Sequence, residues 1–271
     1  MKRVVLTGGA SGMGRATALV LANNGYFVYS FDIKKNEVEN QNIKQMIVDV
    51  TNLQSIQNAY DEISKETKNL DGIINFAGII MMNSLVEISE EDYMKIFNIN
   101  VFGAYRVNKT FFPLIKENKG KIIITTSELA PNKILPFNSI YSISKKSLDA
   151  YAEGLRKELG LFDIPVITLR PGAVKTELIE SSNNALENLE NNTVLYKGIT
   201  KRFKHIVDSQ QGASIPAEKI GKLVLKILEK KKPKFVYTKN ASIKLKLLNL
   251  LPAKLELAVL KMILKDKKTT K

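Results

Sequence analysis

The stretch Thr7-Gly8-Gly9-Ala10-Ser11-Gly12-Met13-Gly14 follows a short apolar run and opens a helical pattern over residues 12–24. Gly8 permits a tight turn, Gly12 lets a pyrophosphate approach the backbone, and Gly14 allows a helix to pack closely on a sheet. The amino end of the helix then faces the anion. A glycine-rich turn without a ligand has the same composition, but the flanking strand and helix favour a dinucleotide-binding loop.

Short apolar runs alternate with longer helical patterns along residues 1–240. The runs predicted to be strands are 4–6, 27–31, 45–48, 72–76, 121–125, 165–169 and 234–237. The helical patterns between them cover 12–24, 52–67, 89–99, 103–118, 138–160 and 217–230. This alternation predicts an α/β fold, a Rossmann-type doubly wound parallel sheet, in a single domain over residues 1–240.

Two regions depart from the alternation. Residues 177–215 are rich in Asn and Ser and show no strand pattern, so we expect an irregular lid over a substrate site. Residues 241–271 form a Leu- and Lys-rich stretch that Pro252 interrupts, which we interpret as a basic amphipathic C-terminal helical tail.

The charge of the chain is concentrated near its end. The net charge is +14, and residues 219–271 carry +13 of it, which leaves +1 for residues 1–218. A nucleic-acid-binding protein would carry positive charge on its folded core, so we expect no nucleic-acid partner. The chain has no cysteine and one histidine, His205, and we expect no metal centre. No signal peptide or membrane-spanning stretch is visible, which predicts a cytoplasmic protein.

Carboxylates after the second and third predicted strands indicate how an adenosine would be bound. Asp32 can accept both ribose hydroxyls of NAD and would repel the 2′-phosphate of NADP. We therefore favour NAD(H), although Lys34 and Lys35 keep NADP(H) open. Asp49-Val50 could present a carboxylate to the adenine amino group, and the alternative is a helix cap near Thr51-Asn52.

Tyr141 and Lys145 are four residues apart, which places them on one face of a helix. The pKa of a phenol is near 10, and a nearby ammonium together with an oxidised nicotinamide would lower it toward the range of a general acid/base. Tyr105 and Lys109 have the same spacing, so the pair alone does not decide the site. Ser127 decides it, because it ends a predicted strand 14 residues before Tyr141 and can bind a substrate oxygen.

These residues together resemble the short-chain dehydrogenase/reductase family, from Thr7 to about Tyr237. The residues that carry the resemblance are the glycine loop, Asn75-Phe76-Ala77-Gly78, Asn100, Ser127, Tyr141, Lys145 and Arg170-Pro171-Gly172. The resemblance implies that Tyr141 is the general acid/base and that Ser127 orients the substrate. It also implies that Lys145 holds the nicotinamide ribose, and that Asn100 keeps a water in a proton relay to Lys145. By the same resemblance, Pro171-Gly172 and Val174 would border the nicotinamide, and Thr176 would touch its carboxamide.

The cofactor-binding residues that we expect are Gly8, Ser11, Gly12, Met13, Gly14, Asp32, Asp49, Val50, Asn75, Ala77, Gly78, Tyr141, Lys145, Pro171, Gly172, Val174 and Thr176. Phe76 departs from the family pattern, which has a second Asn there. The spacing between Ser127 and Tyr141 is one residue longer than usual, so Thr126 and Glu128 are rivals for the serine position.

The substrate is encoded weakly. Apolar side chains in the expected lid and before Tyr141 favour an apolar alcohol or ketone as the substrate, such as a lipid-, steroid- or retinoid-like molecule. The alternative for each of these side chains is ordinary packing in the core. These side chains are Leu178, Ile179, Leu195, Tyr196, Ile199, Phe203 and residues 134–137.

The tail predicts an interfacial helix on anionic lipid. Lys254, Lys261, Lys265 and Lys268 share one side of a helix, and Leu255, Val259, Leu260, Met262 and Ile263 occupy much of the other, interrupted by Glu256. The alternative is a helix packed on its own domain or on a partner subunit.

The sequence thus predicts an NAD(P)-dependent oxidoreductase that interconverts an alcohol and a ketone or aldehyde. The alternative is a catalytically weak dinucleotide-binding sensor or scaffold docked at a membrane surface. The resemblance also implies a homo-dimer or homo-tetramer built through helices 103–118 and 138–160.

Overall fold

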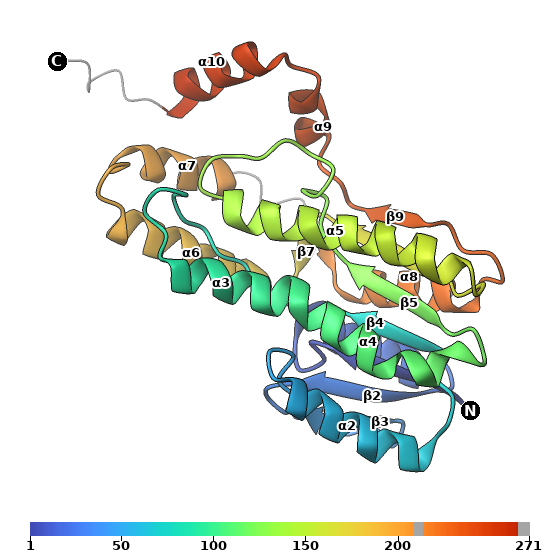
Figure 1. Cartoon of the computed structure of the whole chain (residues 1–271). Helices are drawn as coiled ribbons and strands as arrows, with labels where there is room; N and C mark the ends of the chain where they lie inside the picture. The colour runs from blue at the N-terminus through green and yellow to red at the C-terminus, as the bar shows by residue number, and fades with distance from the viewer. Residues whose placement is uncertain (209–213, 265–271) are drawn as a thin grey trace.

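A parallel sheet forms the centre of the computed structural model, which describes residues 1–208 and 214–264 (Figure 1). The described residues form one seven-stranded sheet in the order β3-β2-β1-β4-β5-β6-β9. Its strands are β1 (Lys2–Thr7), β2 (Tyr26–Asp32), β3 (Ile43–Ile47), β4 (Gly72–Asn75), β5 (Lys121–Thr125), β6 (Val166–Pro171) and β9 (Val236–Lys239). This order, which reverses between β1 and β4, is the doubly wound arrangement that the sequence predicts.

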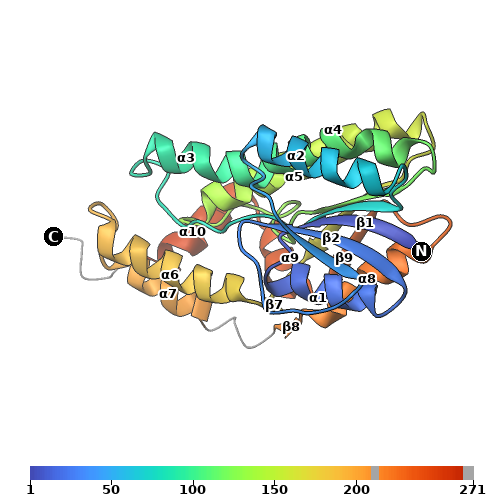
Figure 2. The same cartoon turned by 90° about the horizontal axis from the view of Figure 1, so that it is seen from below.

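Helices cover both faces of the sheet (Figure 2). On one face lie α2 (Leu53–Glu66), α4 (Gly103–Lys116) and α5 (Ser139–Gly160), and on the other lie α1 (Gly12–Ala22) and α8 (Glu218–Glu229). Successive strand residues alternate between these faces, so Val5 packs with the first group while Val4 and Leu6 pack with the second. Both faces are buried, which explains why the strands are continuously apolar.

The helix predicted over 89–99 is α3 (Glu90–Phe97), and it does not end before α4 begins. A π-helical segment, η1 (Asn98–Phe102), joins α3 directly to α4. Ser89 begins α3, because its side chain accepts a hydrogen bond from the Asp92 amide. The joined helices bring residue 100 to the carboxyl ends of the central strands.

Residues 177–215 are largely helical, so the prediction of an irregular, strand-free segment was wrong. They form α6 (Glu177–Asn192) and α7 (Ile199–Asp208), and Ile215 lies in a short strand, β8 (Ile215–Pro216), that pairs with β7 (Val174–Lys175). Leu186, Leu189 and Phe203 are buried in a separate apolar cluster. Tertiary packing of these side chains outweighs the low helix propensity of Asn and Ser.

The tail folds into two helices on either side of Pro252, α9 (Ile243–Asn249) and α10 (Ala253–Leu264). Leu260 and Leu264 of α10 pack against the apolar cluster that holds Phe203 of α7. In the described part of the chain, no helix has the length and apolar content needed to cross a membrane.

Candidate active site

The loop after β1 has the backbone geometry that its glycines predict. The φ of Gly8 is +72° and that of Gly12 is +50°, both in the left-handed region that favours glycine. A Cβ atom at Gly14 would lie 1.9 Å from the carbonyl oxygen of Gly8. Gly14 therefore allows a close approach within the loop, and not, as we expected, between the helix and the sheet.

A cleft of about 1250 Å³ runs from this loop along the carboxyl ends of β2, β3 and β4. The expected cofactor residues that line it are Gly8, Ser11, Gly12, Met13, Gly14, Asp32, Asp49, Val50, Ala77, Gly78 and Thr176. A helix amino end stands at the glycine loop, and carboxylates stand at the ends of the neighbouring strands. This combination fits a dinucleotide, with its pyrophosphate at the helix and its adenosine at the carboxylates.

Asp32 is tied to the glycine loop. Its Oδ2 accepts a hydrogen bond from the Ala10 amide at 3.0 Å, and its Oδ1 accepts one from the Lys34 amide at 3.3 Å. Asn36 adds to this contact, because its Nδ2 donates to the carbonyl oxygens of Gly9 and Ala10 at 3.1 and 3.2 Å. Asn36 was not predicted from the sequence, since nothing in its neighbourhood distinguishes it from the other loop asparagines.

Asp49 serves a local turn as well as the cleft. Its Oδ1 accepts hydrogen bonds from the amide and hydroxyl of Thr51 at 2.8 and 2.7 Å. Asn52, and not Asp49, is the cap of α2, since its side chain accepts from the amides of Gln54 and Ser55. One Asp49 oxygen therefore forms the turn before the helix while the residue lines the cleft.

Asn75 has a different place from its neighbours Ala77 and Gly78. Its side chain is buried against α4, where Nδ2 donates to Oδ1 of Asn108 at 2.8 Å. Asn75 therefore supports the end of β4 from behind the cleft.

Ser127, Tyr141 and Lys145 come together in a smaller cavity of about 190 Å³. Tyr141 and Lys145 lie one turn apart on α5, and Ser127 follows β5. The Ser127 hydroxyl lies close enough to the Tyr141 phenol to lower its pKa, and its oxygen accepts a hydrogen bond from the Leu129 amide at 3.1 Å. The Lys145 ammonium lies 5.8 Å from the centre of the Tyr141 ring and donates to the Thr125 carbonyl at 3.3 Å.

This cavity adjoins the cofactor cleft. Pro171, Gly172, Val174 and Thr176, all expected near a nicotinamide, line the cavity. The residues that line both spaces are Met13, Phe76, Gly78, Ile79, Ile80 and Thr176. The catalytic candidates and the nicotinamide candidates therefore surround one space.

Burial dominates the electrostatics of the cavity. It raises the pKa of Tyr141 to about 12, while the nearby Ser127 hydroxyl lowers it in part. Burial also lowers the pKa of Lys145 to about 8. The direction for Tyr141 is opposite to the one expected from a neighbouring ammonium, because the phenol loses its contact with water in this cavity.

Asn100 lies in η1 with its side chain almost fully buried. Its Oδ1 accepts a hydrogen bond from the Ile79 amide at 2.8 Å, and its Nδ2 donates to the Ile79 carbonyl and the Ser144 hydroxyl, each at 3.0 Å. A Cβ atom at Gly78 would lie 3.1 Å from Asn100 Oδ1 and 3.4 Å from Lys145 Nζ. Asn100 and Lys145 therefore border the same small space.

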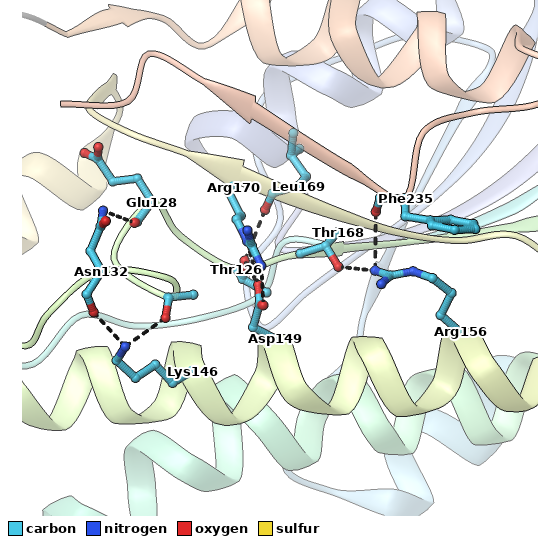
Figure 3. A network of polar contacts seen from close by, with 11 residues as sticks. Thr126, Glu128, Asn132, Lys146, Asp149, Arg156, Thr168, Leu169, Arg170 and Phe235 are labelled. Atoms are coloured by element: carbon cyan, nitrogen blue, oxygen red, sulfur yellow. Dashed lines mark hydrogen bonds and ion pairs between the residues drawn. The ribbon is translucent and has the colours of Figure 1, made fainter. Parts of the chain in front are cut away.

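The structure separates Ser127 from its two rivals. The Thr126 hydroxyl donates to Oδ1 of Asp149 at 3.0 Å, and Asp149 is paired with Arg170 at 2.5 Å (Figure 3). Glu128 Oε2 accepts a hydrogen bond from the Ser242 amide at 2.5 Å. Thr126 thus binds α5 and Glu128 binds the tail, whereas Ser127 contacts Tyr141.

The competing features lie on the surface. Tyr105 and Lys109 form an exposed pair on α4, with Nζ 3.2 Å from the phenol oxygen. His205 is exposed on α7. Within residues 1–208 and 214–264, no group of three potential metal-ligating side chains gathers.

The lid presents a more polar face to the cleft than we expected. The α6 residues that line the cleft are Glu177, Ser181, Asn184, Ala185, Asn188, Leu189 and Asn192. Leu195 is exposed, while Tyr196, Ile199 and Phe203 pack with Phe137 in the apolar cluster under the lid. The side chains of Leu178 and Ile179 lie outside the described ones. The predicted apolar lid lining was therefore wrong for Tyr196, Ile199 and Phe203, because their side chains join the lid to the body.

The family model of short chain dehydrogenases matches residues 2–187. The chain therefore belongs to the short-chain dehydrogenase/reductase family, oxidoreductases that act on CH–OH and C=O groups with NAD(P).

Relatives show the range of the family around this chain. A 3-ketodihydrosphingosine reductase of Bacteroides thetaiotaomicron is 28% identical over 232 residues, which cover 86% of this chain and 85% of the relative. Estradiol 17-beta-dehydrogenase 2 of Rattus norvegicus is 28% identical over 200 residues, 68% of this chain and 51% of the relative. An alcohol dehydrogenase from Thermococcus sibiricus, solved with 5-hydroxy-NADP, has a TM-score of 0.68 at 21% identity and covers 89% of this chain and 97% of its own, which shows the shared fold.

Proposed function

We propose that this oxidoreductase interconverts an apolar alcohol and the corresponding ketone or aldehyde, with Tyr141 as the general acid/base. The observation that carries the proposal is that the buried residues Ser127, Tyr141 and Lys145 line one cavity, and that this cavity shares lining residues with the cleft at the glycine loop. Tyr105 and Lys109, the surface pair on α4 with the same spacing, line neither of these two spaces.

In this proposal, different residues bind the cofactor and transfer the proton. The glycine loop would hold the pyrophosphate, Asp32 the adenosine ribose and Lys145 the nicotinamide ribose. The bound nicotinamide supplies or accepts the hydride. In the reducing direction, Tyr141 Oη donates its proton to the carbonyl oxygen, and in the oxidising direction it takes the proton back.

The neighbours of Tyr141 prepare it for this role. Ser127 Oγ hydrogen-bonds the same substrate oxygen and so orients it. The Lys145 ammonium stabilises the phenolate that Tyr141 becomes during reduction, and Asn100 keeps a water in a relay that ends at Lys145 Nζ. Because Tyr141 is buried, its high pKa keeps the proton on the phenol until a substrate oxygen takes it.

We favour NAD(H) as the cofactor because of Asp32. Its carboxylate stands at the end of β2, facing the cleft beside the glycine loop, where it would repel a 2′-phosphate. Lys34 and Lys35 are exposed close by, so NADP(H) is the alternative.

Apolar side chains around the reacting position support an apolar substrate. Phe76, Ile79, Ile80, Pro171 and Val174 line the cavity of Tyr141. The named substrates of two relatives, a sphingoid ketone and a steroid, are of this kind. We therefore propose a lipid-, steroid- or retinoid-like alcohol or carbonyl compound.

We also propose where the protein acts and how it assembles. Exposed apolar residues and lysines of α9 and α10 support a cytoplasmic protein in peripheral contact with an anionic membrane. Phe102 and Tyr105 are exposed near the start of α4, which supports a homo-dimer or homo-tetramer through α4 and α5.

The substitution Tyr141→Phe tests the catalytic assignment. We expect it to abolish turnover, measured as NADH or NADPH oxidation with a panel of apolar ketones, while cofactor binding is retained. Tyr105→Phe is the matched control, because it removes the same hydroxyl beside a lysine four residues later, and it should leave turnover unchanged. Full turnover by Tyr141→Phe would refute the assignment. Comparing NADH with NADPH in the same panel tests the proposed preference for NAD(H), which rests on Asp32.

A further inference from the structure

The segment that links Ser127 to Tyr141 is held by the C-terminal tail. Residues 128–137, called here the linking loop, leave β5 after Ser127 and return to α5 just before Tyr141. The tail lies more than a hundred residues later in the chain, yet α9 and the turn before α10 contact this loop directly.

Lys133 is the centre of this contact. Its ammonium lies 2.8 Å from the carboxylate of Glu256 on α10 and donates to the carbonyl of Leu251 at 2.5 Å. Its backbone amide donates to Oδ1 of Asn249, the last residue of α9, at 2.8 Å. Only 13% of the Glu256 side chain is exposed, so this ion pair is well shielded from water.

The contact continues inward to the catalytic serine. Asn249 also donates to the side chain of Asn132, whose own Nδ2 donates to the carbonyl of Glu128 at 2.6 Å. Glu128 is the residue after Ser127, and its carboxylate accepts the Ser242 amide just before α9. A continuous series of hydrogen bonds therefore runs from the tail to the backbone next to Ser127.

The other side of the linking loop is fixed to the catalytic helix. Lys146, which follows Lys145 on α5, donates to the carbonyls of Ala130 and Asn132 at 2.9 and 2.6 Å (Figure 3). Phe137 is buried in the same apolar cluster as Leu264 of α10. The loop thus lies between α5 and the tail, and its position depends on both.

We propose that the tail is a positioning element of the active site, and that Lys133 is the positioning residue that transmits its effect to Ser127. The inference rests on the proposed roles of Ser127 and Tyr141. A displacement of about 1 Å at a reacting group can cost up to a hundredfold in rate, so loosening this loop affects turnover without any contact to the substrate.

The test is a double-mutant cycle on Lys133→Met and Glu256→Gln. We expect each single variant to lower kcat by about tenfold with little change in the KM for the cofactor. The double variant should be no slower than Lys133→Met, because both changes break one interaction. Lys133→Arg should restore part of kcat, and Lys254→Met, which removes an exposed cation from the same helix, should change kcat less than twofold.

A second measurement does not depend on turnover. The chain has no cysteine, so Pro131→Cys on the linking loop and Leu250→Cys after α9, both exposed, can carry spin labels at these two positions alone. The distance distribution between the labels should be narrow, and it should broaden when Lys133→Met is added, at a temperature where the variant remains folded.

The outcomes separate this inference from the proposed function. Unchanged kcat and an unchanged label distribution in Lys133→Met would overturn the positioning role. A loss of kcat equal to the loss of folded protein, or additive losses in the double variant, would overturn it as well. If Tyr141→Phe keeps full turnover, the catalytic assignment fails, while the label distances still report whether the tail holds the loop.

Discussion

Lys145 carries a charge that is costly to bury. The side chain is 5% exposed, and burial lowers its pKa from the ordinary 10.5 to about 8. The shift corresponds to roughly 3 kcal/mol of lost stability wherever the ammonium is charged in both the folded and the unfolded chain. The role that we propose for this ammonium beside Tyr141 would therefore cost the protein stability.

The substitution Lys145→Met should stabilise the protein while it abolishes turnover. The cost of burial is fully present below pH 8, and it declines between pH 8 and pH 10.5 as the folded protein no longer has to hold the charge. We therefore expect the Tm of the variant to exceed that of the wild type by several degrees at pH 7, and by less at pH 9.5. Thermal unfolding at both pH values measures this, and a lower Tm at pH 7 would contradict it.

The spacing of a tyrosine and a lysine does not by itself identify the catalytic pair. The spacing of Tyr141 and Lys145 recurs in Tyr105 and Lys109, and their surroundings distinguish the two pairs. The first pair lines a cavity together with Ser127, and the second is exposed on α4. The spacing between Ser127 and Tyr141 is one residue longer than usual. Counting back from Tyr141 therefore left Thr126 and Glu128 as rivals for the serine position.

At the scale of the elements, α5 is fixed to the carboxyl ends of β5 and β6 by one network. Asp149 on α5 binds the guanidinium of Arg170 through two hydrogen bonds, at 2.9 and 2.5 Å, and accepts the Thr126 hydroxyl (Figure 3). Both partners are about four-fifths buried. This network sets the distance between α5 and Ser127. It also explains why Arg170 is among the residues that carry the resemblance to the family.

Breaking that network should destabilise the fold. Asp149→Asn leaves a largely buried guanidinium without its counter-charge, so we expect the free energy of unfolding to fall by about 2–3 kcal/mol. Glu153→Gln, four residues further along α5, breaks an exposed pair with Lys157 and should cost less than about 0.5 kcal/mol. Urea unfolding of both variants measures the difference, and equal losses would refute the role of Asp149.

The lid is the element that the sequence described least well. Asn and Ser favour caps and turns locally, which is why 177–215 predicted an irregular segment. The helices form because α6 and α7 bury Leu186, Leu189 and Phe203 against Met82 and Phe137, which are distant in sequence. No local pattern contains those partners.

At the scale of the whole molecule, the tail is amphipathic in a different way from the one expected. Leu260 and Leu264 turn inward to the body, and Glu256 is drawn inward by Lys133. Ile243, Leu247, Leu250, Leu257 and Met262 remain exposed, together with Lys246, Lys254 and Lys261. Lys265 and Lys268 lie outside the described residues. The inner side of the tail thus packs on its own domain, and its outer side is left for the proposed membrane contact.

We expect the protein to bind vesicles rich in phosphatidylserine, and to be released by deletion of residues 241–271 or by raised salt. Leu250→Glu with Met262→Glu should also release it while leaving turnover intact, because both side chains are exposed to solvent. Leu161→Glu, a change at an exposed leucine after α5, is the control and should bind as the wild type does. Co-sedimentation measures binding to the vesicles. Equal binding by the full-length protein and by the form that lacks residues 241–271 would contradict the proposal.

The sequence by itself determined the layered fold, the glycine loop and the catalytic candidates. These follow from local rules, since apolar alternation, glycine conformations and the carboxyl ends of parallel strands need no distant partner. Only the tertiary structure decided that the lid is helical and that Asn75 faces α4. It also decided that burial raises the pKa of Tyr141 and that the tail is bonded to the linking loop. Each depends on which distant residues exclude water from a side chain or bond to it. Glu256 shows the difference most directly, because it interrupts the apolar pattern of its helix and finds its partner in Lys133, more than a hundred residues earlier.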